Sequence, residues 1–337
     1  MKFTAVRLNA DTYPVEPEEV QAMAQAGAEL WSIEGHRAEE ILAAARDCDA
    51  LLVVSAQVPE AVIAQLRRCR TIARLGAGVD KIDVQAATGH GIVVSNVPDF
   101  CLGEQADHSM ALLLSCARQL PFMQTAMRRG HWTARQHPAV RRLAGRTLGL
   151  VGFGASAQAV AQRAAGFGFQ LQAWTRSPSK YGALAESLGV ALVPLDQLLA
   201  SSHFVSIHLP LNAETRGLLG ARELALMPSD AVLINTSRGA IVDEAALVTA
   251  LQGRRITGAA LDVFESIDVF APPGDPPQHP LLELDNVIAT PHCAGSSVES
   301  SHESKVRGAQ HAAAVLAGRW PAHVVNTSVV PRFPLSP

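Results

Sequence analysis

A glycine-rich turn between an apolar stretch and a helical pattern constrains the fold of this chain most. The segment LVGFGASAQAVA places Gly152, Gly154 and Ala157 in the order G-x-G-x-x-A. The first glycine permits a tight turn, the second lets the backbone approach a pyrophosphate, and the helix N-terminus favours an anion. An ordinary glycine turn in a βα unit is the alternative, but a strand pattern precedes this one and a helix pattern follows it. The pattern therefore predicts a dinucleotide cofactor, and we expect its pyrophosphate to bind at Gly152, Gly154, Ala155 and Ser156.

The residues after the next strand pattern bear on the choice of cofactor. An acidic side chain there would bond the ribose 2′-hydroxyl of NAD, whereas an arginine accommodates the 2′-phosphate of NADP. This chain has Thr175 followed by Arg176. The sequence therefore favours NADP over NAD, with an exposed arginine in a polar turn as the alternative interpretation of Arg176.

Short apolar runs alternate with helical patterns along the whole chain. This rhythm begins at Phe3 and restarts after Arg146, and it is typical of parallel sheets covered by helices on both faces. At 337 residues, the chain is long enough for two domains. We predict an α/β protein of two Rossmann-like, doubly wound parallel-sheet domains. The dinucleotide-binding domain, residues 100–292, is inserted into a substrate domain built from residues 1–99 and 293–337.

Composition excludes several functional classes. The formal net charge is −3 without a lysine or arginine cluster, which argues against nucleic acid and anionic membranes as partners. Apolar runs are shorter than the roughly 18 residues that suggest a membrane span. The five cysteines form no C-x-x-C pair, which favours reduced thiols over a disulfide framework or a zinc site. We expect a cytoplasmic protein that holds no metal.

Several stretches in a fixed order resemble the D-isomer-specific 2-hydroxyacid dehydrogenase family. They are LGAGVDKID, GFGASA, HLPLNAETRGLL, INTSRGAIVDE, GAALDVFE, NVIATPHCAG and PAHVVN, and the similarity extends from about residue 50 to Asn326. The resemblance implies hydride transfer between NAD(P)H and a small 2-keto or 2-hydroxy acid. Glyoxylate/hydroxypyruvate reductases and phosphoglycerate dehydrogenases are members of this family.

The resemblance also implies catalytic residues. Arg238 corresponds to the family's substrate arginine, whose planar guanidinium suits a carboxylate. His292 corresponds to the acid/base histidine, a residue type that exchanges protons near neutral pH. The family's third member, a glutamate, would fall at Ile267. Asp268 or Glu265 takes that role, or no carboxylate does; of these we favour Asp268.

The resemblance implies further residues that bind the substrate and the cofactor. Ala77 and Gly78 correspond to the loop whose backbone amides hold the substrate carboxylate, and Asp262 to the aspartate that meets the nicotinamide carboxamide. Ser109 is expected either near the nicotinamide or in helix packing, and the remaining histidines and cysteines receive no role. The residues expected to line the rest of the cofactor cleft are His208, Pro210, Thr236, Ser237, Ala294 and Gly295.

The sequence is also compatible with two alternative functions, and it suggests one form of assembly. A non-enzymatic, cofactor-sensing scaffold of the same fold is compatible with the missing glutamate, although Arg238 and His292 argue against it. A family member that oxidises another donor, such as formate or phosphite, is the second alternative. The apolar helix expected at residues 103–120 continues into LPFMQTAM, and the family implies that this segment packs a homodimer.

Overall fold

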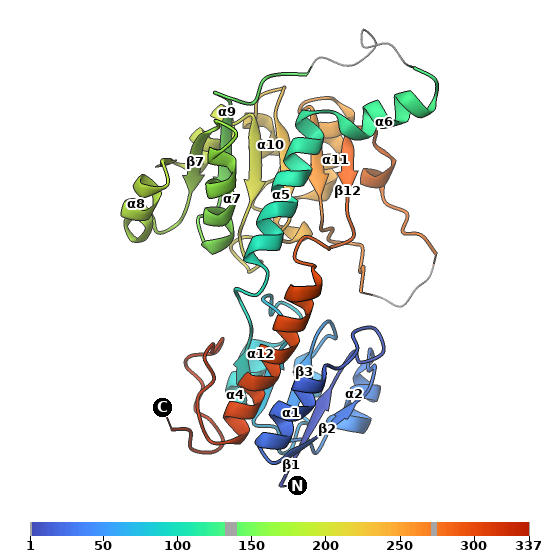
Figure 1. Cartoon of the computed structure of the whole chain (residues 1–337), viewed down its shortest axis with the longest axis vertical. Helices are drawn as coiled ribbons and strands as arrows, with labels where there is room; N and C mark the ends of the chain where they lie inside the picture. Colours follow the sequence, from blue (N-terminus) through green and yellow to red (C-terminus); the bar gives the residue numbers. More distant parts are fainter. Residues whose placement is uncertain (1, 132–139, 271–274, 337) are drawn as a thin grey trace. The chain divides into compact units, whose positions relative to one another are not determined.

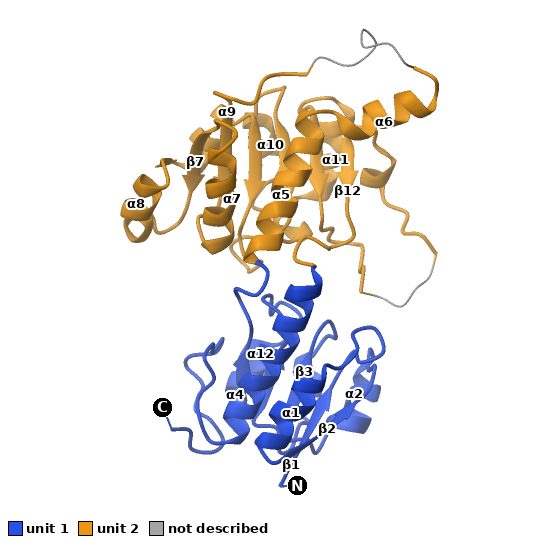
Figure 2. Ribbon diagram, viewed as in Figure 1, with its two compact units in different colours: residues 1–101, 297–337 blue, residues 102–296 orange. Residues whose placement is uncertain are grey.

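The computed structural model describes residues 2–131, 140–270 and 275–336. The chain forms two compact units (Figures 1 and 2), one made of residues 1–101 with 297–337 and the other of residues 102–296. Each unit contains one sheet whose strands all run parallel. The two parallel α/β sheets confirm the predicted fold class.

The first unit is built on a five-stranded sheet. In sheet order its strands are β2 (Ala28–Ser32), β1 (Phe3–Arg7), β3 (Ala50–Val53), β4 (Thr71–Arg74) and β5 (Val93–Ser95). Its helices are α1 (Pro17–Gln25), α2 (Ala38–Ala45), α3 (Glu60–Ile63), α4 (Val84–Gly89) and α12 (Val298–Leu316).

Helix α12 packs against α1, β3 and β4, so the end of the chain completes the first unit. A glycine allows this close approach, because a Cβ at Gly308 would lie 2.2 Å from Cδ2 of Leu75. Lys305 on α12 reaches the segment before α1, where its Nζ donates to the carbonyl of Pro14 at 3.0 Å and to Glu16 at 2.7 Å.

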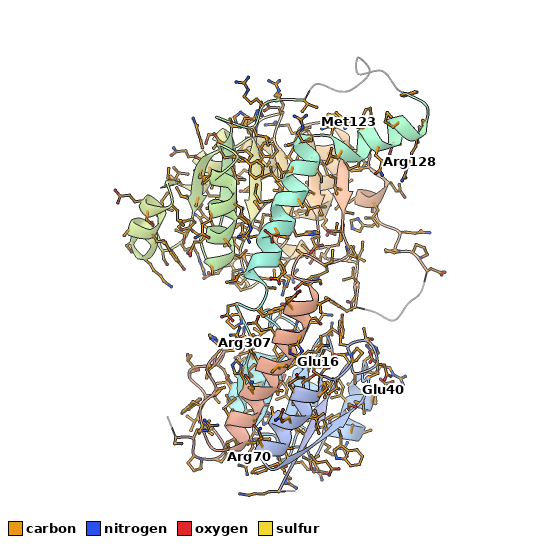
Figure 3. All side chains as sticks on the ribbon, in the orientation of Figure 1. Glu16, Glu40, Arg70, Met123, Arg128 and Arg307 are labelled. Carbon is orange, nitrogen blue, oxygen red and sulfur yellow. The ribbon has the colours of Figure 1, made fainter. Side chains whose placement is uncertain are left out.

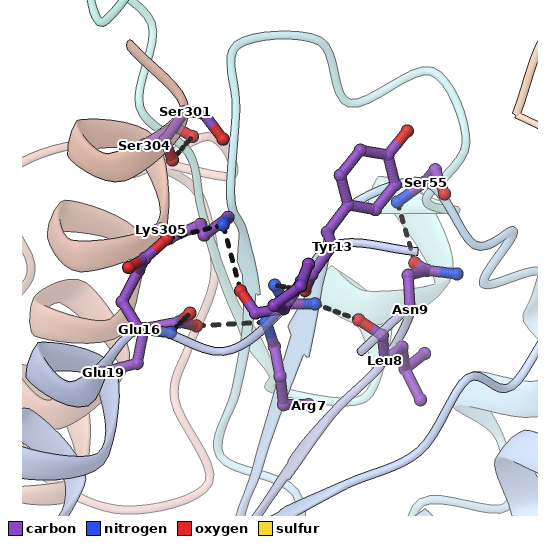
Figure 4. Close-up of polar contacts among 11 residues, drawn as sticks. Arg7, Leu8, Asn9, Tyr13, Glu16, Glu19, Ser55, Ser301, Ser304 and Lys305 are labelled. Atoms are coloured by element: carbon purple, nitrogen blue, oxygen red, sulfur yellow. Dashed lines mark hydrogen bonds and ion pairs between the residues drawn. The ribbon is translucent and has the colours of Figure 1, made fainter. Parts of the chain in front are cut away.

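Buried polar contacts fix the loops at the carboxyl ends of β1 and β3 (Figure 4). Nε of Arg7 donates to Glu19 at 3.0 Å, and both side chains are 0% exposed. Burial lowers the pKa of Arg7, and the charge of Glu19 opposes that shift. Oδ1 of Asn9 accepts from the backbone N–H groups of Ser55 and Ala56, at 2.9 Å each. These bonds satisfy polar groups that would be costly to bury unpaired.

The second unit is built on a seven-stranded sheet. In sheet order its strands are β12 (Val287–Ala289), β11 (Gly258–Leu261), β10 (Val232–Asn235), β9 (Phe204–Ile207), β6 (Thr147–Val151), β7 (Gln170–Trp174) and β8 (Val190–Leu192). The α-helices are α5 (Leu102–Ala117), α6 (Leu120–Arg128), α7 (Ala155–Ala165), α8 (Pro178–Ser187), α9 (Leu195–Ser201), α10 (Ala221–Leu226) and α11 (Glu244–Gln252). Two 3₁₀ turns complete it, η2 (Gly239–Ile241) and η3 (Pro280–Glu283).

The central strands of this sheet are buried on both faces. All residues of β9, β10 and β11 are buried, as expected of strands covered by helices on each side. The strand order reverses between β6 and β9, where the two halves of the sheet meet. In open α/β sheets, ligands bind outside the carboxyl ends of the strands at such a point.

The helix predicted at residues 103–120 ends slightly earlier in the structure, and a second helix follows it. Helix α5 ends at Ala117, and Gln119 takes a left-handed backbone conformation with φ of +54° before α6 begins. Pro121 lies in the first turn of α6, where a proline does not remove a helical hydrogen bond. None of the helices in the described part of the chain has the length and apolar character needed to cross a membrane.

Candidate active site

The strand register brings the sequence-predicted cofactor residues into one row. Ile207 of β9 lies beside Val151 of β6 and Asn235 of β10, which in turn lies beside Leu261 of β11. Leu261 lies beside Ala289 of β12. The residue after each strand end therefore stands at the same edge of the sheet. These residues are Gly152, His208, Thr236, Asp262 and Thr290.

The glycine-rich turn needs glycine at its first position. Gly152 has φ of +102°, and a Cβ there would lie 2.4 Å from the carbonyl oxygen of His208. Gly154 caps the N-terminus of α7 with an ordinary backbone conformation, and a Cβ there would meet nothing within 4 Å. The N-terminus of α7, at Ala155 and Ser156, thus faces this edge of the sheet and favours an anion.

His208 is a neutral side chain held between two hydroxyl groups. Its Nδ1 lies 2.9 Å from Oγ of Ser156, and its Nε2 lies 2.8 Å from Oγ of Ser206. Burial lowers the pKa of His208 to about 4. A neutral imidazole has one donor and one acceptor nitrogen, which fits one hydroxyl on each side.

The segment after β10 is fixed by bonds to its neighbours. Oγ of Ser237 donates to the carbonyl of Ile207 at 2.9 Å. Oγ1 of Thr236 lies 2.8 Å from Oγ of Ser109 on α5. Ser109 is 2% exposed, so it packs against Thr236 from the helix side.

In the loop after β9, the carbonyl of Pro210 accepts from Oγ1 of Thr215 at 2.7 Å.

Arg176 lies after β7, at the position expected to distinguish NAD from NADP. Its guanidinium pairs with the carboxylate of Glu214, which lies in the loop after β9, and both side chains are exposed. Oγ1 of Thr175 accepts from the N–H of Ser177 at 3.3 Å. An acidic group is therefore present beside Arg176, but it belongs to the loop after β9, which was not expected to influence the choice of cofactor.

Arg238 follows β10 and precedes the turn η2. Its Nη1 donates to the carbonyl of Ser237 at 2.7 Å, and its own carbonyl accepts from Nδ2 of Asn235 at 2.9 Å. Gly239 permits close contact with the segment after β11, because a Cβ there would lie 2.2 Å from the carbonyl carbon of Phe264. The half-buried arginine is thus fixed against its neighbours at both ends.

His292 has an unusual backbone conformation. Its φ is +55°, a region that few non-glycine residues adopt. Its N–H donates to the carbonyl of Asp262 at 2.8 Å and approaches that of Thr290 at 3.1 Å. The ring of Phe270 packs on the imidazole with 4.9 Å between centroids. Sequence reasoning did not identify Phe270 as a neighbour of His292.

Asp262 is a buried carboxylate with several donors. Its Oδ1 accepts from Oγ1 of Thr290 at 2.5 Å and from the N–H of Cys293 at 3.0 Å, and its Oδ2 accepts from the N–H of Ala294 at 2.8 Å. The residue is 0% exposed. Burial and the charge of Asp262 raise the pKa of the Cys293 thiol. Gly295 completes this turn before α12.

The two carboxylates considered as partners of His292 have different surroundings. Glu265 pairs with the guanidinium of Arg216, and its N–H donates to Glu244 at 2.6 Å. Oδ1 of Asp268 accepts from the N–H of Phe270 at 3.1 Å. Because Phe270 contacts the imidazole of His292, the segment that carries Asp268 approaches the histidine.

The loop after β4, in the first unit, has its carbonyl groups tied back. The carbonyl of Gly76 accepts from the N–H of Val97 at 3.0 Å. Those of Ala77 and Gly78 accept from Nδ2 of Asn96 at 2.7 Å and from Nε of Arg74 at 3.0 Å. In the described part of the chain, the N–H groups of Ala77 and Gly78 donate to no acceptor. Backbone N–H groups without an acceptor, next to a cationic side chain, suit a carboxylate.

Comparison with known proteins identifies the family of this chain. The family described as D-isomer specific 2-hydroxyacid dehydrogenase, NAD binding domain, matches residues 110–294. A glyoxylate reductase of Korarchaeum cryptofilum is 37% identical over 307 residues, covering 90% of each chain. A D-3-phosphoglycerate dehydrogenase of Methanocaldococcus jannaschii is 36% identical over 95% of this chain, which spans 60% of that protein.

A solved structure is similar over the whole chain. The NADPH-dependent glyoxylate/hydroxypyruvate reductase of Sinorhizobium meliloti, in complex with NADP and malonate, has a TM-score of 0.83 and 30% identity. The similarity covers 99% of this chain and 100% of that one. From these matches and the site geometry, the chain belongs to the D-isomer specific 2-hydroxyacid dehydrogenase family.

Proposed function

We propose that this protein reduces a small 2-keto acid to the 2-hydroxy acid with NADPH, and catalyses the reverse reaction with NADP. The observation that carries this proposal is the row of residues at the carboxyl edge of the seven-stranded sheet. That row joins the glycine turn at Gly152 to the segments that hold Arg238 and His292. A cofactor turn and an acid/base histidine at one sheet edge suit hydride transfer coupled to proton transfer.

The chain's own residues divide the chemistry between them. When bound, the nicotinamide supplies or accepts the hydride at C2 of the substrate. His292 donates a proton to the carbonyl oxygen during reduction and removes it during oxidation. Arg238 binds the substrate carboxylate and polarises the neighbouring carbonyl. Asp268 stabilises the protonated imidazole of His292.

The loop after β4 is the proposed second anchor for the substrate carboxylate. Its N–H groups at Ala77 and Gly78, for which the described part of the chain offers no acceptor, match the family's carboxylate-binding loop. Hydrogen bonds from Asn96 and Arg74 hold the opposite side of this loop. Residues 1–101 with 297–337 thus act as the substrate domain, and residues 102–296 act as the cofactor domain.

NADP is the proposed cofactor, with NAD as the alternative. Arg176 and Thr175 would hold the 2′-phosphate, and the N-terminus of α7 would hold the pyrophosphate. Asp262 faces the nicotinamide carboxamide while keeping its bonds to the backbone of residues 293 and 294. The remaining residues proposed to line the cofactor are His208, Pro210, Thr236, Ser237, Ala294 and Gly295.

A panel of substrates tests this proposal. The full-length protein is assayed for oxidation of NADPH and NADH with glyoxylate, hydroxypyruvate, pyruvate and 3-phosphohydroxypyruvate, and in the other direction with formate and phosphite. We expect turnover of at least one keto acid, faster with NADPH. Cofactor binding without turnover of any compound in the panel would favour the cofactor-sensing scaffold, and turnover of formate or phosphite alone would favour the other donor class.

We also propose that the protein is a cytoplasmic homodimer. Helix α6 exposes Leu120, Phe122 and Met127, which are 53%, 51% and 49% accessible. Met123 lies on the same helix, with Arg128 at its end (Figure 3). Apolar side chains gathered on one short helix are typical of an interface. Light scattering at micromolar concentration should give the mass of two chains, and a monomer would contradict this.

A further inference from the structure

The turn that carries His292 needs support from outside its own sequence. A φ of +55° at this position is a conformation that surrounding contacts must maintain. The N–H of His292 itself is held by the carbonyl of Asp262, and the next two N–H groups are held by the Asp262 carboxylate. The orientation of the imidazole therefore depends on where the side chain of Asp262 lies.

Thr290 sets the orientation of that carboxylate. Its hydroxyl lies 2.5 Å from Oδ1 of Asp262. An ionised carboxylate only accepts hydrogen bonds, so the single hydroxyl proton of Thr290 points at Asp262. The lone pairs of Oγ1 then remain available to accept a hydrogen bond from another group.

His108 on α5 supplies that hydrogen bond. Its Nε2 lies 3.1 Å from Oγ1 of Thr290 and 3.6 Å from Oδ1 of Asp262. Since the Thr290 proton is already donated to Asp262, Nε2 of His108 must carry the proton of this contact. The sequence gives His108 no role, and it is separated from Thr290 by 182 positions along the chain.

We propose that His108 is a positioning residue for His292, acting through Thr290 and Asp262. The inference rests on the proposed role of His292 as acid and base. His108 fixes the hydroxyl of Thr290, Thr290 fixes the carboxylate of Asp262, and Asp262 fixes the backbone of the turn. Small displacements of a catalytic group slow the reaction strongly, about a hundredfold for roughly 1 Å. Removing one link should therefore lower kcat by a larger factor than it weakens cofactor binding.

Two pairs of variants separate this role from general structural support. His108→Leu and Thr290→Val keep the side-chain bulk but remove the hydrogen bond, whereas His108→Gln and Thr290→Ser retain one. With NADPH and glyoxylate, we expect the first pair to lower kcat roughly tenfold to a hundredfold. The Kd for NADPH, from its fluorescence, should rise by a smaller factor than kcat falls, because Asp262 is also the proposed partner of the nicotinamide carboxamide, and the second pair should recover most of kcat.

His203→Leu is the matched control in the same unit. Nδ1 of His203 accepts from the N–H of Thr147 at 3.1 Å, at the amino edge of the same sheet, away from the row that includes Asp262. This variant should keep kcat. An equal loss of kcat in His203→Leu would overturn the positioning role, as would unchanged kcat in His108→Leu and Thr290→Val beside an inactive His292→Ala. If His292→Ala itself keeps the normal rate, the proposed function fails instead.

Should either apolar variant not fold, His108→Gln and Thr290→Ser remain informative. Their recovery is then judged against His108→Asn, which places its amide short of Thr290. Under the proposal, His108→Asn loses kcat and His108→Gln keeps it at similar melting temperatures. Equal kcat in the two variants would contradict the proposal.

Discussion

Arg176 and Glu214 form an ion pair across two different loops, one after β7 and the other after β9. Both side chains are exposed, so the pair contributes little to stability. Its consequence concerns the cofactor, because Glu214 competes for the guanidinium proposed to bind the 2′-phosphate.

The first prediction tests this competition. Arg176→Ala should raise the KM for NADPH roughly tenfold to a hundredfold more than that for NADH, since a charge-assisted bond contributes ~1.5–3 kcal/mol. Glu214→Gln should lower the KM for NADPH and leave that for NADH in place. Asp285→Asn, which disrupts the exposed pair with Arg254, is the control. Equal effects of Arg176→Ala on the two cofactors would show that Arg176 does not contact the phosphate.

The second prediction concerns pH and His208. Burial lowers the pKa of His208 to about 4, below the ordinary value of about 6.5. The neutral form is therefore favoured in the fold. The preference for the neutral form adds to the free energy of unfolding. This contribution is complete above pH ~6.5 and is lost as the pH falls toward 4, which lowers the free energy of unfolding by about 3 kcal/mol at most. Urea unfolding of the cofactor-free protein should show a smaller fall in the free energy of unfolding between pH 7 and 4.5 for His208→Gln than for the wild type. Identical falls would mean that His208 is protonated in the folded protein.

The third prediction compares the two glycines of the cofactor turn. Gly152→Ala should destabilise the protein by roughly 1–3 kcal/mol, because the left-handed backbone is strained for alanine and its Cβ would overlap the carbonyl of His208. Gly154→Ala meets no such obstacle and should melt within a few degrees of the wild type. Thermal unfolding without cofactor measures both. A similar loss in the two variants would contradict the geometry assigned to Gly152.

The fourth prediction identifies the carboxylate that supports His292. Keto-acid reduction needs the protonated imidazole, so its rate should fall as the pH rises, and a nearby carboxylate moves that fall to higher pH. Asp268→Asn should therefore move the falling limb of the pH–rate profile to lower pH. Glu265→Gln should leave the limb in place, because Glu265 pairs with Arg216. A profile that neither variant moves would show that no such carboxylate acts here.

Features that depend on short stretches of sequence could be predicted, whereas contacts between distant segments could not. The turn at Gly152, the parallel sheets and the family could be predicted, because each depends on a short pattern or on the order of several patterns. The edge strand β2 was not predicted: only Ala28 among its five residues is buried, so it lacks the apolar alternation of a half-buried strand. The pairing of His108 with Thr290 could not be predicted either, because the packing of α5 and the position of β12 in the sheet decide which residues meet.

The left-handed conformation of His292 could not be predicted from the sequence either. Glycine marks such positions in a sequence, whereas a histidine there gives no comparable signal. The carbonyl groups of Gly76 and Ala77 are similar, since Val97 and Asn96, which donate to them, lie beyond β5 and not next to the loop. Both features depend on hydrogen bonds between chain segments that only the fold brings together.

The fate of a labelled hydride distinguishes direct hydride transfer to the keto acid from any other use of the cofactor. Glyoxylate is reduced with NADPH that carries deuterium at C4 of the nicotinamide on the transferred face, and the product is examined by mass spectrometry and NMR. The account predicts one deuterium at C2 of the glycolate, formed by the wild type and by His292→Ala, but ~10²–10⁴ times more slowly by the variant. Product without deuterium at C2, or His292→Ala at the wild-type rate, would contradict the account.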